Sequence, residues 1–126
     1  MSIEDRLADL GIDLPPVAKP VAAYVPAIQV GDQISTSGQL PLVSGSLPMT
    51  GLVGDQISQE DAAGQARVAA LNALAAAADV AGGVNNIRRV VRVVVYVANT
   101  ADFTAQPAVA NGASELFGEI FGDAGR

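Results

Sequence analysis

The 126-residue chain contains no cysteine and no histidine. These absences exclude thiol nucleophiles, disulfide bonds, zinc sites built from Cys and His, and catalysis by an imidazole base, including Ser-His hydrolysis. Carboxylates alone can bind a metal, but the Asp and Glu residues are scattered without the spacing of a calcium-binding loop. We therefore expect no bound metal and no cofactor.

Aromatic residues are also scarce, at 4%, and tryptophan is absent, although half of the residues are hydrophobic. The core must therefore consist mainly of Ala, Val, Leu and Ile. Small side chains bring helices and strands close together and leave little room for a pocket inside one subunit. This composition favours a ligand site between subunits.

Basic residues are few, with 7 Lys and Arg against 13 Asp and Glu and a net charge of −6. Because a protein that holds a phosphate backbone usually presents a basic face, we expect no nucleic-acid partner. The apolar run from Ala73 to Ala78 is far shorter than a membrane span, and the charged start, residues 1–6, does not resemble a signal peptide. We therefore expect a cytoplasmic protein with no membrane partner.

The first half of the chain predicts a short helix and a hairpin. Ser2 can cap a helix over residues 2–10, and a proline-rich connector follows to residue 20. Strands are predicted at 24–30 and 33–37, joined by a Gly-Asp turn. Residues 41–57 are rich in Gly, Pro and Ser and predict a long loop.

The second half predicts two helices around a strand. Ser58 caps a helix that ends at Gly82-Gly83, and residues 102–105 and 107–121 suggest a second helix. Residues 87–98 between them are mostly β-branched and predict a strand. One face of this strand is apolar and the other carries arginines, so the second face either meets a partner or packs against another layer.

This order of elements predicts an α+β fold, a mixed sheet with both helices packed on one face. We divide the chain into residues 1–20, the short helix and connector, and residues 21–126, the main domain. No strand follows the second helix, so we expect this domain to lack its last strand or strands.

Several motifs in this order resemble the YjgF/RidA family, over residues 21–121, in a less characterised branch. They are Ala23-Tyr24-Val25-Pro26, Val30-Gly31-Asp32, Thr36-Ser37-Gly38-Gln39-Leu40-Pro41, Gln65-Ala66-Arg67 with Asn72, Val95-Tyr96-Val97 with Asp102-Phe103, and Asn111, Glu115 and Phe117. The resemblance implies a chorismate-mutase-like fold, a homotrimer, and ligand clefts between subunits. It also implies hydrolysis of reactive enamines and imines such as 2-aminoacrylate. Older names for the family are translation inhibitor and endoribonuclease, which the acidic charge and missing histidine do not favour.

The resemblance also implies roles for five residues. Ser37 hydrogen-bonds ligand or water, or else only its own backbone. Gly38 either lets a ligand approach the backbone closely or is a turn glycine. Tyr24 either forms a wall of the pocket or packs in the core. Asn111 orients the substrate or lies on the helix surface. The family's carboxylate-binding arginine maps slightly beyond this sequence, so Arg126 is the candidate catalytic residue. The alternative is that Arg126 is a solvated terminal arginine.

Three functions remain open from the sequence. The first is a deaminase of enamine or imine intermediates that grips a small carboxylate-bearing metabolite. The second is a trimer that binds such a metabolite without converting it. The third is a structural or regulatory oligomer that meets a protein partner through its strand edges.

Overall fold

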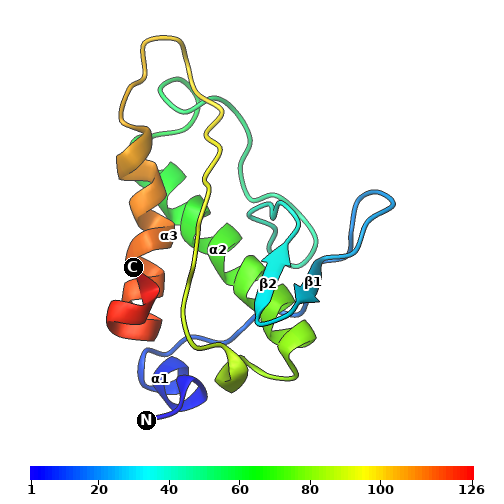
Figure 1. The fold of residues 1–126 in the computed structure, drawn as a ribbon. Coiled ribbons are helices and arrows are strands. Elements are labelled where there is room, and N and C mark those ends of the chain that lie inside the picture. Colours follow the sequence, from blue (N-terminus) through cyan, green and yellow to red (C-terminus); the bar gives the residue numbers. More distant parts are fainter.

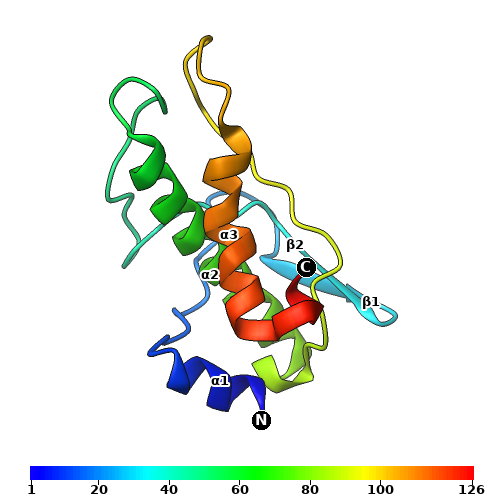
Figure 2. The ribbon, with the colours of Figure 1, turned by 90° about the vertical axis from the view of Figure 1, so that its left-hand side faces the viewer.

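A computed structural model describes all 126 residues as a mixed α+β fold, which confirms the predicted class. The chain forms three α-helices and one β-hairpin (Figure 1). Figure 2 shows α2 and α3 on one side of the hairpin and of the extended segment 87–98. The elements are α1 (Ile3–Asp9), β1 (Ala27–Val30), β2 (Gln33–Thr36), α2 (Gln59–Ala81), the 3-10 turn η1 (Val84–Asn86), α3 (Gln106–Phe121) and the 3-10 turn η2 (Gly122–Gly125).

The hairpin pairs β1 with β2 in antiparallel register, with Val30 opposite Gln33. Only Gly31 and Asp32 lie between the strands, and Gly31 has a φ of 60°, which suits a tight turn of this kind. The predicted strand at 24–30, in which Pro26 marks either an edge strand or the start of the strand, is shorter in the structure and begins at Ala27. The strand begins after Pro26, since proline has no amide hydrogen to contribute to a ladder.

Side-chain caps define where two helices begin. The hydroxyl of Ser2 accepts a hydrogen bond from the amide of Asp5, and Ser58 accepts one from Asp61, as the sequence predicts. Helix α2 ends at Gly82, whose φ of 83° is the left-handed conformation that glycine adopts most easily. Both ends of the long central helix are therefore determined locally.

Helices α2 and α3 form the centre of the molecule, and Leu116 on α3 is fully buried there. A Cβ at Gly112 would overlap the carbonyl oxygen of Ala63, so glycine permits the close approach of the two helices. Arg67 and Glu119 connect the same helices at the surface, with a nitrogen–oxygen distance of 3.3 Å. Helix α1 packs on this core through Leu7.

The predicted strand at 87–98 is extended but belongs to no sheet, so the prediction of a paired strand is wrong. Its backbone is held only near its ends. The amide of Val90 donates to the carbonyl oxygen of Ala124, and the carbonyl oxygen of Ala98 accepts from Val53. The physical reason is that β-branched residues favour an extended chain, whereas a ladder needs a neighbouring strand. Residues 102–105 are likewise not helical, and α3 begins at Gln106.

Burial is sparse for a chain of this composition, with only 18 of 126 residues buried. Several large apolar side chains lie on the surface, notably Tyr96, which is 92% exposed, and Val91, which is 71% exposed. Exposed apolar surface of this extent marks places where a protein meets a partner. The single chain therefore offers apolar surface for association.

Candidate functional site

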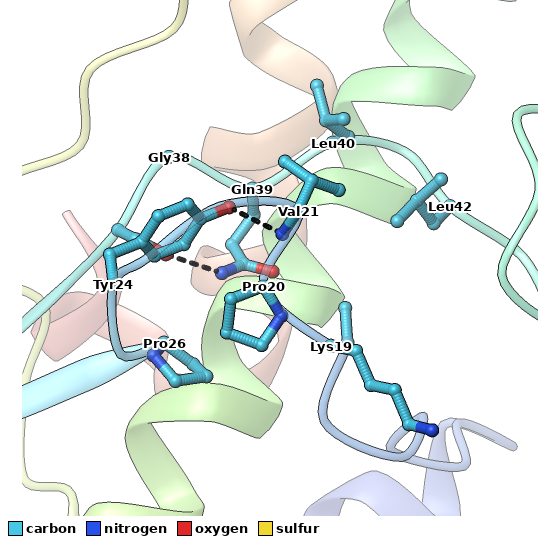
Figure 3. A pocket seen from close by; sticks show the side chains of 11 residues that line it. Lys19, Pro20, Val21, Tyr24, Pro26, Gly38, Gln39, Leu40 and Leu42 are labelled. Atoms are coloured by element: carbon cyan, nitrogen blue, oxygen red, sulfur yellow. Dashed lines mark hydrogen bonds between the residues drawn. The ribbon is translucent and has the colours of Figure 1, made fainter.

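A small pocket lies between the proline-rich connector and the segment that follows β2 (Figure 3). Three of the predicted site residues, Tyr24, Ser37 and Gly38, line it together, beside Pro20 and Gln39. Its volume is about 20 Å³, which is room for about one water molecule. A metabolite does not fit into this space within a single chain.

Ser37 has two hydrogen bonds that fix its position. Its backbone amide donates to the carbonyl oxygen of Pro26 at 2.8 Å, which extends the hairpin by one pair beyond β2. Its hydroxyl oxygen accepts from the side-chain amide of Gln39 at 3.1 Å (Figure 3). Because the oxygen is an acceptor in this bond, the hydroxyl hydrogen remains available for donation to a ligand or to water.

Tyr24 forms one wall of the pocket and is 41% exposed, so it is not the core aromatic that the sequence left as an alternative. Its hydroxyl accepts a long hydrogen bond of 3.4 Å from the amide of Val21 (Figure 3). A bond of this length is weak. The phenol group can therefore exchange this partner for a ligand at little cost.

Gly38 is exposed and lies next to Ser37. A Cβ at this position would meet no other atom within 4 Å, and the φ of Gly38 is not in the left-handed range. Neither packing within the chain nor backbone conformation therefore requires glycine here. The missing side chain instead leaves the backbone beside the Ser37 hydroxyl open to approach.

Asn72 was part of the family resemblance but was predicted to have no role in the site. This residue of α2 is only 2% exposed. Its side-chain nitrogen donates to the carbonyl oxygens of Leu40 at 2.9 Å and Leu42 at 3.0 Å. Both leucines line the pocket, so Asn72 attaches one pocket wall to the central helix. The signal for it was a polar residue on the otherwise apolar face of a long helix.

Asn111 and Arg126 lie away from this pocket. Asn111 is exposed on α3 and makes no side-chain hydrogen bond. The side chain of Arg126 is 83% exposed, and its one ion pair, with Asp123, spans 4.0 Å. Lys19 does line the pocket, but its ammonium group points away from Tyr24 and Gln39 (Figure 3). No cation is therefore directed at the Ser37 hydroxyl within one chain.

The chain has no cluster of three or more His, Cys, Asp or Glu side chains that can hold a metal ion. None of the helices combines the length and the apolar character needed to cross a membrane.

Comparison with known proteins gives consistent matches over nearly the whole chain. Residues 4–126 match the family described as "YjgF/chorismate mutase-like, putative endoribonuclease". Protein TCP17 of Trypanosoma cruzi is 37% identical over 118 residues, which cover 94% of this chain and 74% of that protein.

Two crystal structures are also similar to this chain. One is of a protein described as a "putative endoribonuclease" from Shewanella oneidensis MR-1, with a TM-score of 0.91 and 35% identity over 100% of this chain and 83% of that one. The other is of the protein Atu1372 from Agrobacterium tumefaciens, described as having unknown function. Its TM-score is 0.85, with 40% identity over 99% of this chain and 77% of that one.

Proposed function

Because this chain belongs to the YjgF/chorismate mutase-like family, we propose that it hydrolyses reactive enamines or imines that carry a carboxylate. The enamine first tautomerises to the imine. Water then adds to the C=N carbon, and the C–N bond breaks to release ammonia and leave a keto acid. The reaction needs a positioned water and a grip on the carboxylate, and it needs neither a thiol nor an imidazole.

The observation that carries this proposal is the Ser37 hydroxyl, held by Gln39 with its hydrogen free and with the open backbone of Gly38 beside it. A hydroxyl in this state can donate to the imine nitrogen or to the attacking water, and it can accept a hydrogen bond as well. Tyr24, which also lines the pocket, adds a second hydroxyl with only a weak internal partner.

The active cleft, in this proposal, forms between subunits of a homotrimer. The pocket in one chain has a volume of only about 20 Å³, so a second wall is needed to enclose a metabolite. The exposed apolar side chains, with Tyr96 at 92%, supply a surface for that association. Arg126 remains the candidate for the carboxylate, since its exposed 4.0 Å pair with Asp123 contributes little and restrains it weakly.

A second candidate function is binding of a small carboxylate-bearing metabolite without conversion, as in a regulatory protein. The composition of the pocket favours it. No Asp or Glu lines the pocket, so nothing within one chain acts as a general base towards water there. The hydroxyl groups of Ser37 and Tyr24, together with the accessible backbone at Gly38, are sufficient to bind a ligand without converting it.

The charge and composition of this chain do not favour the endoribonuclease activity that the names of its relatives describe. Cleavage of RNA requires a grip on phosphates, which a net charge of −6 opposes, and acid–base groups, of which histidine is absent.

The proposal is tested by measuring keto acid release from freshly generated 2-aminoacrylate, with the remaining imine trapped by semicarbazide. We expect acceleration by the protein and a loss of about tenfold or more in Ser37→Ala, since a positioned proton donor contributes on this scale or above. The matched control is Ser114→Ala, an exposed serine on α3 outside the pocket.

The same preparation is examined by analytical ultracentrifugation and by thermal unfolding with 2-oxobutanoate as a carboxylate probe. A folded oligomer that leaves the release rate unchanged would contradict the enzymatic proposal. If the probe still raises the Tm of that protein and the rise disappears in Ser37→Ala, the binding function takes its place.

A further inference from the structure

Gln39 has a single side-chain hydrogen bond, and that bond goes to the Ser37 hydroxyl two residues before it. The side-chain nitrogen of Gln39 donates to the hydroxyl oxygen at 3.1 Å (Figure 3). We propose that Gln39 is a positioning residue that fixes the Ser37 hydroxyl as a hydrogen-bond donor, so that the pocket selects 2-oxo and 2-imino acids and rejects 2-amino acids. This role rests on the function proposed above, because it concerns the same pocket.

The bond of Gln39 does not connect distant parts of the chain. It spans two residues, whereas the side-chain amide of Asn72 reaches Leu40 and Leu42 across 32 and 30 residues. Gln39 is only half-buried and makes no other side-chain hydrogen bond. An amide that stabilises a fold commonly binds backbone groups of another segment, as Asn72 does. The effect of Gln39 is therefore confined to the hydroxyl that it contacts.

The direction of this bond determines what Ser37 presents to a ligand. A hydroxyl has one hydrogen to donate, and a side-chain amide nitrogen can only donate. Since the oxygen of Ser37 accepts from Gln39, its hydrogen takes no part in that bond and is left for another acceptor. The backbone of Ser37 is also held, by the bond from its amide to the carbonyl oxygen of Pro26 at 2.8 Å. The pocket therefore contains a hydroxyl donor in a fixed place.

The other polar side chains that line the pocket act in the same sense. The phenol oxygen of Tyr24 accepts from the amide of Val21, so its hydrogen is also free to donate. Lys19 can only donate, and no Asp or Glu lines the pocket. The pocket has room for about one water molecule, and therefore for one oxygen or nitrogen atom of a ligand. A ligand atom among these donors is best bound when it is an acceptor.

This arrangement distinguishes three ligands that share one carbon skeleton. The keto oxygen of a 2-oxo acid and the nitrogen of a neutral 2-imino acid each have a lone pair that can accept from Ser37. The ammonium group of a 2-amino acid has only donors and no lone pair. It would face the hydroxyl hydrogen and leave that hydrogen without an acceptor, which is costly when the ligand excludes water.

The first experiment compares 2-oxobutanoate with 2-aminobutanoate, which differ only in the group on their second carbon. Affinities are measured by NMR titration at neutral pH, where the amino group is protonated. We expect the unaltered protein to bind 2-oxobutanoate about tenfold more tightly or better, since a site that pairs with a ligand group discriminates against a ligand that lacks it. Equal or tighter binding of 2-aminobutanoate, or no binding of either compound, would overturn the proposal.

A double-mutant cycle tests whether Gln39 acts through Ser37. Gln39→Glu offers an acceptor to the Ser37 hydroxyl in place of a donor, and so captures its hydrogen. We expect the affinity for 2-oxobutanoate to fall by about tenfold or more. The same substitution in Ser37→Ala protein should cost much less, because only the repulsion between the new carboxylate and the ligand remains. Equal losses in the two backgrounds would contradict a role through Ser37.

Gln39→Met is the matched neutral variant, with a side chain of similar length that cannot donate. It releases the Ser37 hydroxyl without adding a charge, so we expect a loss of about threefold in affinity for 2-oxobutanoate and no loss in Ser37→Ala protein. Circular dichroism and thermal unfolding verify that both Gln39 variants fold. Affinity equal to that of the unaltered protein would show that Gln39 does not position the hydroxyl.

These experiments measure binding, so their outcome is separate from that of the keto acid assay. A protein that converts 2-aminoacrylate but shows no coupling between Gln39 and Ser37 retains the deaminase function and refutes the role of Gln39. A protein that shows the coupling without conversion supports the role of Gln39 and has the binding function instead.

Discussion

Asn72 donates its side-chain amide to the carbonyl oxygen of Leu40 across 32 residues of sequence, at 2.9 Å, and the same nitrogen also reaches Leu42. The bond connects the wall of the small pocket to the long central helix. Because Asn72 is almost fully buried, its removal would leave two carbonyl groups without this partner.

We expect Asn72→Ala to lower the free energy of unfolding by about 1–3 kcal/mol, the usual cost of leaving buried polar groups unsatisfied. Urea unfolding followed by circular dichroism measures this change. Asn111→Ala is the control for stability, because that side chain is exposed and unbonded, and its cost should stay within about 0.5 kcal/mol. Equal costs for the two variants would show that the Asn72 bonds contribute nothing to stability.

Two glycines on α3 should respond in opposite directions to the same substitution. Gly112→Ala places a methyl group against the carbonyl of Ala63 and forces α2 and α3 apart, at a cost of about 1–3 kcal/mol. Gly118→Ala meets open space in the same helix and should stabilise the protein by about 0.5–1 kcal/mol. Thermal unfolding of both variants checks the signs, and a stabilised Gly112→Ala would refute the close helix approach.

The cap of α2 gives a third prediction. Ser58→Ala removes the acceptor for the amide of Asp61 and should lower stability by about 1 kcal/mol. Ser58→Gly should cost only a few tenths of that amount, since water can reach the freed amide. Chemical denaturation of both variants measures the difference, and an unchanged midpoint in Ser58→Ala would mean that the cap bond is not formed in solution.

The fourth prediction concerns association through Tyr96. Tyr96→Asp introduces a charge on an almost fully exposed apolar side chain and should shift a self-associated protein towards the monomer. Tyr96→Phe keeps the apolar ring and should leave the distribution unchanged. Sedimentation velocity over a concentration series measures both, and identical profiles for the two variants would place Tyr96 outside any subunit interface.

Local signals were sufficient for most of the fold. The hydroxyls of Ser2 and Ser58 and the turn at Gly31 act on residues close in sequence, so the helix starts and the hairpin turn could be predicted. The extended backbone of 87–98 was also predictable from its β-branched residues. Its pairing was not, because a ladder depends on which segment folds beside it.

The same distinction holds for the site. All five candidate site residues came from the family resemblance, and three of them, Tyr24, Ser37 and Gly38, line one pocket because they lie on or next to one hairpin. The contact of Asn72 with Leu40 depends on how a helix packs on a distant loop, which no local pattern reports. Asn111 and Arg126 lie outside the pocket within one chain.

The unpaired stretch from Val91 to Val97 also has a consequence for solubility. A β-branched segment with free amides is a template for edge-to-edge aggregation and for amyloid-like stacking. Charged residues beside such a segment commonly suppress this process, and Arg88, Arg89 and Arg92 stand immediately before or within its first residues. The arginines of this segment therefore act as gatekeepers, and we expect their neutralisation to increase precipitation by strand stacking.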